Sequence, residues 1–250
     1  MEIDRSAPAL SAGGEIIDSY LNGCVFCDSR HETFGNTPEF KRITEGKIPN
    51  RKLFETENFV VFPTVGQIVE GYLLIMPKSH TTSIANMNKQ LFDELEYVYS
   101  QTSNILESNY SKPIFFEHGV CRTAYDNYNG CCVDHAHIHA VPAQVNVSNE
   151  LKKEFKFTKI KKVSELAKIG KNGNYLYVDD ISGDKLVFEA NSVRSQHIRY
   201  LIAEELNVPE KGDWYIYPGE QEINATIRKL SKEKMKKFEE TMLVVGKDER

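Results

Sequence analysis

The chain has 250 residues, with 31 Lys and Arg against 36 Asp and Glu, which gives a formal net charge of −5. Because the basic residues are dispersed, an extensive nucleic-acid-binding surface is not expected. The sequence has no run of about 18 apolar residues and no basic-then-apolar leader, which argues against a membrane span and a secretory signal. Five cysteines are an odd number, and in a reducing, cytoplasmic compartment this favours metal ligands or packed thiols over disulfides.

The N-terminal half alternates short apolar segments with one long amphipathic segment. Residues 1–14 combine small residues with Pro and Gly and are expected to form a flexible leader. Two short runs, 52–55 and 59–62, flank a turn and predict a hairpin. The nearly continuous apolar run 71–77 predicts a strand buried on both faces. Residues 88–108 carry apolar side chains at three-to-four spacing, which predicts an amphipathic helix.

Two more strands, over 114–118 and 131–141, complete the expected catalytic domain of residues 15–148. Its fold class is α+β, an antiparallel sheet with a long helix packed across it. The polarity changes after this segment, so we expect a domain boundary near residue 148 and a smaller C-terminal α+β domain over 149–250. The elements predicted for that domain are a hairpin of 175–179 with 185–189, a helix over 195–206, a strand over 214–217 and a charged helix from Ser231.

The segment Asp134–Pro142 contains three of the seven histidines, His135, His137 and His139, at strict two-residue spacing. On a strand, these three side chains would project from one face, while the small and apolar residues between them face the other side. Three aligned imidazoles are typical of metal ligation, or of nucleophilic and acid–base chemistry on a phosphate. A chance run of surface histidines is the alternative.

This His-x-His-x-His run, followed by apolar residues, resembles the signature of the histidine triad family of nucleotide hydrolases and transferases. The resemblance extends over roughly residues 24–142. It implies that His137 attacks the α-phosphate of a nucleoside phosphate conjugate or a dinucleoside polyphosphate, forming a covalent nucleotidyl-histidine, and that His139 donates to a phosphoryl oxygen. We expect a hydrolase, and a nucleotidyltransferase stays open. A protein of another class, which binds nucleotides in the same pocket without turnover, is the alternative.

The cysteines Cys24 and Cys27 form a CxxC motif, which is typical of half a zinc site or of a redox pair, or arises by coincidence. In CxxC-bearing members of the family, the first triad histidine and a histidine after a Pro-x-x segment complete a zinc site. The resemblance therefore implies a structural Zn²⁺ held by Cys24, Cys27, His80 and His135. Buried thiols without a metal are the alternative.

Three further residues are candidates for binding the substrate. Glu117 stands where the family carries Asn, and it either meets a ribose hydroxyl or a cationic substrate group or is a surface charge at the end of a strand. Cys131 stands near the place of a polar family residue shortly before the triad, although burial against the sheet also explains it. Arg199 either reaches the substrate phosphates, whose geometry suits a guanidinium, or lies on a surface helix.

The assembly of the chain stays open at this stage. Many members of the family dimerise through the long helix, so a homodimer is one arrangement that the resemblance allows. The additional C-terminal segment could instead cover that helix or complete the pocket.

Overall fold

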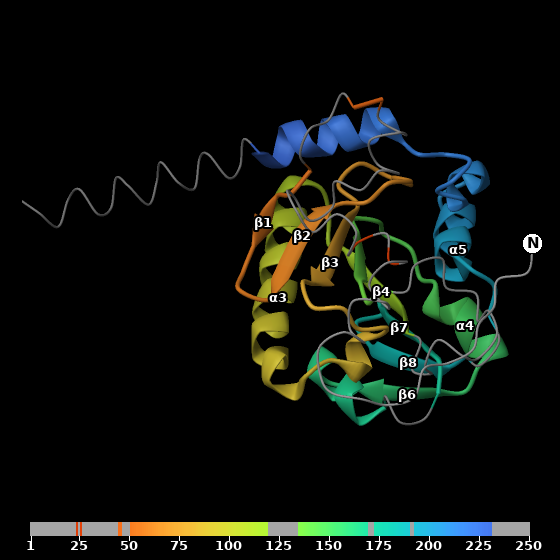
Figure 1. The fold of residues 1–250 in the computed structure, drawn as a ribbon. Helices are drawn as coiled ribbons and strands as arrows, with labels where there is room; N and C mark the ends of the chain where they lie inside the picture. The colour runs from red at the N-terminus through yellow and green to blue at the C-terminus, as the bar shows by residue number, and fades with distance from the viewer. Residues whose placement is uncertain are drawn as a thin grey trace, which may run out of the picture.

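The computed structural model describes residues 24, 26, 45–46, 51–119, 135–169, 173–190 and 193–231. Within this part of the chain, one eight-stranded sheet has the order β1-β2-β3-β5-β4-β7-β8-β6 (Figure 1), and its neighbouring strands are antiparallel. The strands are β1 Phe54–Glu55, β2 Phe59–Pro63, β3 Leu73–Pro77, β4 Ile114–Gly119, β5 Ile138–Val141, β6 Phe157–Ile160, β7 Tyr175–Asp179 and β8 Lys185–Glu189.

The helical elements lie on both faces of the sheet. They are the short 3₁₀ helices η1 Ile84–Asn86, η2 Lys89–Leu91, η3 Val163–Lys168 and η4 Pro209–Gly212, the α-helices α3 Phe92–Asn109, α4 Ser148–Glu154 and α5 His197–Glu205, and the helical residues 220–231. No helix among the described residues has the length and apolar character needed to cross a membrane. The predicted α+β class, with an antiparallel sheet and a long helix, is confirmed.

The segment after residue 148 does not build a sheet of its own. Its strands β6, β7 and β8 extend the sheet of the N-terminal half, because β7 pairs with β4 in a register that places Glu117 opposite Tyr177. The same sheet therefore continues across the boundary expected near residue 148. Both predicted hairpins are present, as β1 with β2 and as β7 with β8.

The predicted strand over 214–217 is wrong, because residues 214–216 form a turn and residue 217 belongs to no strand. Asp213 explains the difference. Its carboxylate accepts a hydrogen bond from the amide of Tyr215 at 2.9 Å, and its carbonyl accepts one from the amide of Tyr217 at 2.9 Å. A side chain that bonds the backbone two residues later stabilises a turn and competes with strand pairing. Residues 220–231 are helical, and all but the first residue of the charged helix predicted from Ser231 lie outside the described residues.

Alternation along the strands gives the sheet two apolar faces. On one face, side chains such as Phe115, Ile138 and Ala140 belong to the core formed with α3. On the other face, Phe116 and Val141 belong to the core formed with α4 and α5. Figure 1 shows α3 on one side of the sheet and α4 and α5 on the other. The central strands are therefore covered on both faces.

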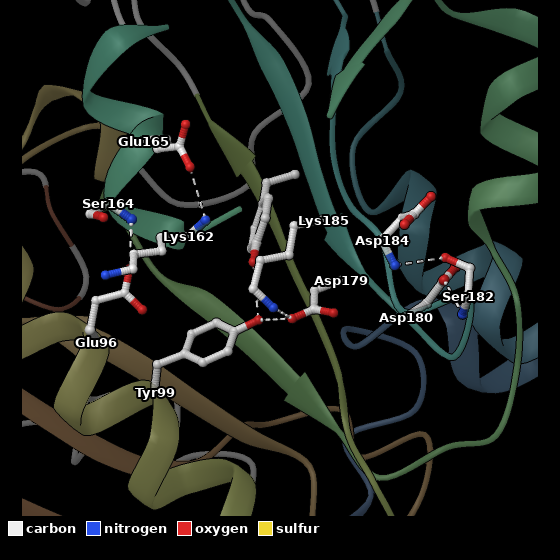
Figure 2. A network of polar contacts seen from close by, with 11 residues as sticks. Glu96, Tyr99, Lys162, Ser164, Glu165, Asp179, Asp180, Ser182, Asp184 and Lys185 are labelled. Carbon is white, nitrogen blue, oxygen red and sulfur yellow. Dashed lines mark hydrogen bonds and ion pairs between the residues drawn. The ribbon is translucent and has the colours of Figure 1, made fainter. Parts of the chain in front are cut away.

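A polar cluster joins the C-terminal strands to α3 (Figure 2). The hydroxyl of Tyr99 donates to Asp179 of β7 at 2.6 Å, and Lys185 of β8 pairs with the same carboxylate. At the start of η3, the amide of Ser164 donates to Glu96 of α3 at 3.0 Å. The C-terminal segment thus packs against the long helix of the N-terminal half.

Gln67 connects the loop between β2 and β3 to the C-terminal helical residues. It is fully buried, and its amide donates to the carbonyls of Thr64 at 3.1 Å and Tyr72 at 2.6 Å. Its side-chain oxygen accepts from the amide of Tyr72 and from the hydroxyl of Thr226, both at 3.1 Å. Thr226 in turn accepts from the amide of Gly71 at 2.8 Å. One side chain therefore fixes the entry into β3.

We predict that Gln67→Ala lowers the free energy of unfolding by about 2–4 kcal/mol, because it leaves the buried amide of Tyr72 and the hydroxyl of Thr226 without their acceptor. Urea unfolding measures the change. The control is Gln90→Ala at an exposed position of η2, which should change stability by no more than about 0.5 kcal/mol. Equal losses in the two variants would contradict the role of Gln67.

Candidate functional site

The triad histidines lie at the start of β5, which is shorter than predicted. Pairing as a strand begins only at Ile138, so His135 and His137 precede it. Residues 131–134 of the expected strand, including Cys131, lie outside the described residues. The imidazole of His139 stacks on the Phe116 ring at 4.3 Å with an interplanar angle of 8°. The rings of His137 and His139 are 4.6 Å apart, so the sheet brings these two imidazoles together.

His137 is held by the backbone of its own segment. Its Nδ1 lies 2.6 Å from the carbonyl oxygen of His135. A carbonyl can only accept, so Nδ1 carries the proton and Nε2 keeps its lone pair. Burial lowers the pKa of His137 below its ordinary value, and the hydrogen bond to the carbonyl opposes this shift. The arrangement gives a neutral imidazole with one nitrogen available as a nucleophile.

His139 is held by a side chain rather than by a carbonyl. Its Nδ1 lies 2.7 Å from the hydroxyl of Tyr72, the residue that precedes β3. Burial lowers the pKa of His139 well below its ordinary value, and the neighbouring His137, Arg199 and His118 lower it further. His139 is therefore a neutral group that exchanges a hydrogen bond with Tyr72.

Three of the four expected metal ligands gather at the first triad histidine. Sγ of Cys24 lies 3.5 Å from Nδ1 of His135, and one ligand atom each from Cys24, His80 and His135 lie within 4.8 Å of one another. In a tetrahedral zinc site, with Zn–S of about 2.3 Å and Zn–N of about 2.0–2.1 Å, sulfur and nitrogen stand about 3.5 Å apart. Cys27 lies outside the described residues.

The hydrogen bonding of His135 suits a ligand role. Its Nε2 lies 2.8 Å from the carbonyl oxygen of Pro77, to which it must donate. The Nδ1 lone pair therefore faces Cys24, in the manner of metal-binding histidines whose second nitrogen is fixed by an outer partner. Burial lowers the pKa of His135 to about 4, which keeps the imidazole neutral.

Glu117 is not brought to the triad. On β4 it shares the α3 face with Phe115, whereas the stacking partner of His139, Phe116, faces the other way. The side chain of Glu117 is 1% exposed, so the alternative of a surface charge is wrong. It accepts hydrogen bonds from the amide of Ile84 at 2.7 Å and from the hydroxyl of Tyr175 at 2.5 Å. These bonds tie η1 to the sheet.

Arg199 is brought close to the triad, and the alternative of a surface position is wrong because its side chain is 4% exposed. It lies on α5 with its Cζ 5.3 Å from the centroid of the Tyr72 ring. Its Nη2 donates to the carbonyl of Gly66 at 2.7 Å and to that of Lys211 at 3.2 Å, and its Nε donates to the carbonyl of Gly212 at 3.1 Å.

Two residues that were not among the predicted site residues lie near the triad. Tyr72 lies at the start of the apolar run that predicted β3. Its hydroxyl, a polar group at the end of a buried run, was the sequence signal that could have indicated a role in the site. For His118 the sequence left two positions open, pointing into the pocket or ending its strand. The register that places Phe116 opposite His139 continues toward His118 and His137. Nε2 of His118 is buried and has no hydrogen-bond partner among the described residues.

The sequence matches the family model described as "Scavenger mRNA decapping enzyme C-term binding" over residues 37–154. It is 32% identical over 105 residues to an uncharacterized HIT-like protein of Chlamydia muridarum, covering 41% of this chain and 79% of that protein. It is 25% identical over 125 residues to adenosine 5'-monophosphoramidase HINT3 of Mus musculus, covering 49% of this chain and 65% of the mouse protein. The chain thus spans just under two thirds of the length of that relative.

Among solved structures, a Zn-bound histidine triad family protein from Mycobacterium smegmatis aligns with a TM-score of 0.32 and 18% identity. The alignment covers 53% of this chain and 89% of that protein.

We predict that Glu117 makes stability fall as the pH rises. Burial raises its pKa from the ordinary value of 4.5 to about 7, so between these values the folded chain holds a proton that the unfolded chain releases. The free energy of unfolding should therefore decrease between about pH 4.5 and pH 7, by on the order of 3 kcal/mol from this group.

The matched variant is Glu117→Gln, which imitates the protonated carboxyl. Urea unfolding of both proteins at pH 5 and pH 8 gives the difference that belongs to this residue. Wild type should lose more stability than the variant between the two pH values. An equal loss in both proteins would show that Glu117 does not titrate differently in the folded and unfolded states.

Proposed function

We propose that this chain, which belongs to the histidine triad family, hydrolyses a nucleoside phosphate conjugate or a dinucleoside polyphosphate through a covalent intermediate on His137. A nucleotide-related function follows from the family. The observation that carries the proposal is the hydrogen bond from Nδ1 of His137 to the carbonyl of His135, because it directs the lone pair of Nε2 away from the backbone.

In the first step, Nε2 of His137 forms a bond to the α-phosphorus, and the bond from phosphorus to the leaving group breaks with its electron pair on that group. The product is a nucleotidyl-histidine. In the second step, water forms a bond to phosphorus and releases a proton to solvent. The bond from phosphorus to Nε2 breaks with its electron pair on Nε2, and His137 returns to its neutral form. An acceptor other than water would make the same chemistry a nucleotidyl transfer.

Negative charge on the phosphoryl oxygens has to be stabilised in both steps. His139 is the group we assign to this task, since its ring is 4.6 Å from that of His137 and its Nδ1 is already engaged by Tyr72. A donation from its Nε2 to a phosphoryl oxygen requires that Nδ1 accept the hydrogen bond from Tyr72.

The covalent step is tested with nucleoside polyphosphates labelled at the α-phosphorus, quenched in alkali. Wild type is expected to carry acid-labile label on His137. His137→Ala should carry none and should turn over at least about 10³-fold more slowly, with an unchanged urea midpoint showing that it is folded. Binding of nucleotides without label or turnover in wild type would instead identify a nucleotide-binding protein.

A structural Zn²⁺ is the second part of the proposal, with Cys24, His80, His135 and Cys27 as its ligands. The first three supply one sulfur and two imidazoles at suitable spacing. Four protein ligands would close the coordination sphere, so the ion would hold the segment around Cys24 against the triad and would take no part in the reaction.

We predict about one equivalent of zinc per chain in protein purified without chelator. His80→Ala and Cys24→Ser should each reduce this content and lower the urea midpoint, because three ligands bind the ion more weakly than four. Glu117→Gln, on the other face of the sheet, should retain the metal. Elemental analysis giving less than about half an equivalent in wild type would count against the site.

A further inference from the structure

We propose that Arg199 and Tyr72 are positioning residues that fix the tautomer of His139. In this relay, Arg199 donates to the hydroxyl of Tyr72, the hydroxyl donates to Nδ1 of His139, and the proton of His139 therefore lies on Nε2. The catalytic consequence rests on the proposed function, whereas the tautomer itself does not.

The donors of Arg199 show why it acts through Tyr72 rather than on a phosphate directly. A guanidinium has five N–H donors. The Nε donor and both Nη2 donors are occupied by the carbonyls of Gly212, Gly66 and Lys211. The bidentate edge formed by Nε and Nη2, which would bind a phosphate, is thus already filled. Among the described residues, Nη1 is the guanidinium nitrogen that bonds no carbonyl.

The buried charge of Arg199 favours a hydrogen bond in which Arg199 donates to Tyr72. Its side chain is 4% exposed, and no carboxylate among the described residues forms an ion pair with it. A buried cation held only by carbonyl dipoles is costly and favours nearby acceptors. The centroid of the Tyr72 ring lies 5.3 Å from Cζ of Arg199, so the hydroxyl of Tyr72 is the acceptor that we assign to Nη1.

The tautomer follows from counting protons. Burial raises the pKa of Tyr72 to about 12, although the charge and hydrogen bond of Arg199 oppose the shift, so the hydroxyl keeps its single proton. Arg199 can only donate, which makes the oxygen of Tyr72 the acceptor in that contact. The proton of Tyr72 is then free to point at Nδ1 of His139, 2.7 Å away.

The backbone around the relay is shaped for a close approach. Gly66 has φ of +76°, and a Cβ added there would lie 2.9 Å from Nη2 of Arg199 and 2.2 Å from Cβ of Trp214. A side chain at this position would displace the guanidinium from its carbonyl. Arg199 and Trp214 both lie beyond residues 37–154, the part that matches the family model. The C-terminal segment therefore supplies the guanidinium that lies beside Tyr72.

The test is the tautomer of His139, observed by ¹⁵N–¹H correlation of the imidazole nitrogens in protein labelled at histidine. The signal is assigned by its loss in His139→Gln. Wild type is expected to show the proton on Nε2 alone. Tyr72→Phe and Arg199→Lys should each show a mixture of tautomers, because the donor to Nδ1 is lost or turned away. A proton on Nδ1 in wild type, or an unchanged signal in both variants, would overturn the proposal.

Kinetics supply the second measurement. In both variants kcat should fall about ten-fold, the worth of one hydrogen bond to the transition state, while KM changes by less than about two-fold. The control is Tyr200→Phe, which removes a hydroxyl from α5 that bonds Asp213 at 3.3 Å and should leave both the tautomer and kcat unchanged. A fall in kcat of the same size in Tyr200→Phe would assign the effect to packing of α5 and overturn the relay.

The two proposals fail in different ways. If wild type forms no adduct and turns over no nucleotide, the hydrolase proposal fails, while the NMR signal of His139 still decides whether Tyr72 and Arg199 fix the tautomer.

Discussion

The position of β5 between β3 and β4 is the constraint on which the candidate site depends. Hydrogen bonds on both sides hold its register, with His139 opposite Leu74 on one neighbour and Phe116 on the other. A slip of one residue would turn the imidazole toward α3 and send Ile138 or Ala140 to the other face. Both faces are packed, so the cost of burying the wrong side chains on each face selects a single register.

Glu117 and Arg199 are buried on opposite faces of the sheet, and the two charges are accommodated in different ways. Glu117 can take up a proton, and burial raises its pKa to about 7. Arg199 cannot lose its proton at any pH that the folded chain meets, so its charge is balanced by three carbonyls and by the ring of Tyr72. The acid on the α3 face can therefore become neutral, whereas the face that carries the triad retains a fixed positive charge, which suits an anionic ligand.

Local patterns in the sequence predicted the elements whose signals are local. The hairpin of β7 and β8, the helix α3 and the apolar strand β3 follow from turn residues and from periodicity within a few residues. The pairing of β4 with β7 joins Glu117 to Tyr177 across the chain, and no turn marks it. For this reason, the extension of the sheet past residue 148 could not be predicted. The turn at Asp213 was missed because its carboxylate bonds the backbone two residues later, and this hydrogen bond overrides the strand propensity of residues 214–217.

The candidate site, like the fold, could be predicted from the sequence only in part. The spacing of the three histidines is visible in the sequence, and the grouping of Cys24, His80 and His135 was expected from the resemblance. The contact of Arg199 with Tyr72 depends on how α5 packs on the sheet, and the sequence of neither segment alone predicts that packing. Glu117 was expected near the substrate, but side chains on β4 alternate between the two faces of the sheet. The sequence of β4 alone does not show which of these faces also carries the triad.

The three triad histidines have the same side chain and the same spacing, but each makes a different hydrogen bond in this structure. His135 is bonded through Nε2 to the carbonyl of Pro77 and presents Nδ1, whereas His137 is bonded through Nδ1 to the carbonyl of His135 and presents Nε2. His139 is bonded through Nδ1 to a hydroxyl, which can donate as well as accept, so its state depends on what else that hydroxyl contacts. The backbone fixes the first two imidazoles whatever the side chains around them. The third is the one whose protonation a distant residue can set, and this makes it the point at which the C-terminal segment acts on the triad.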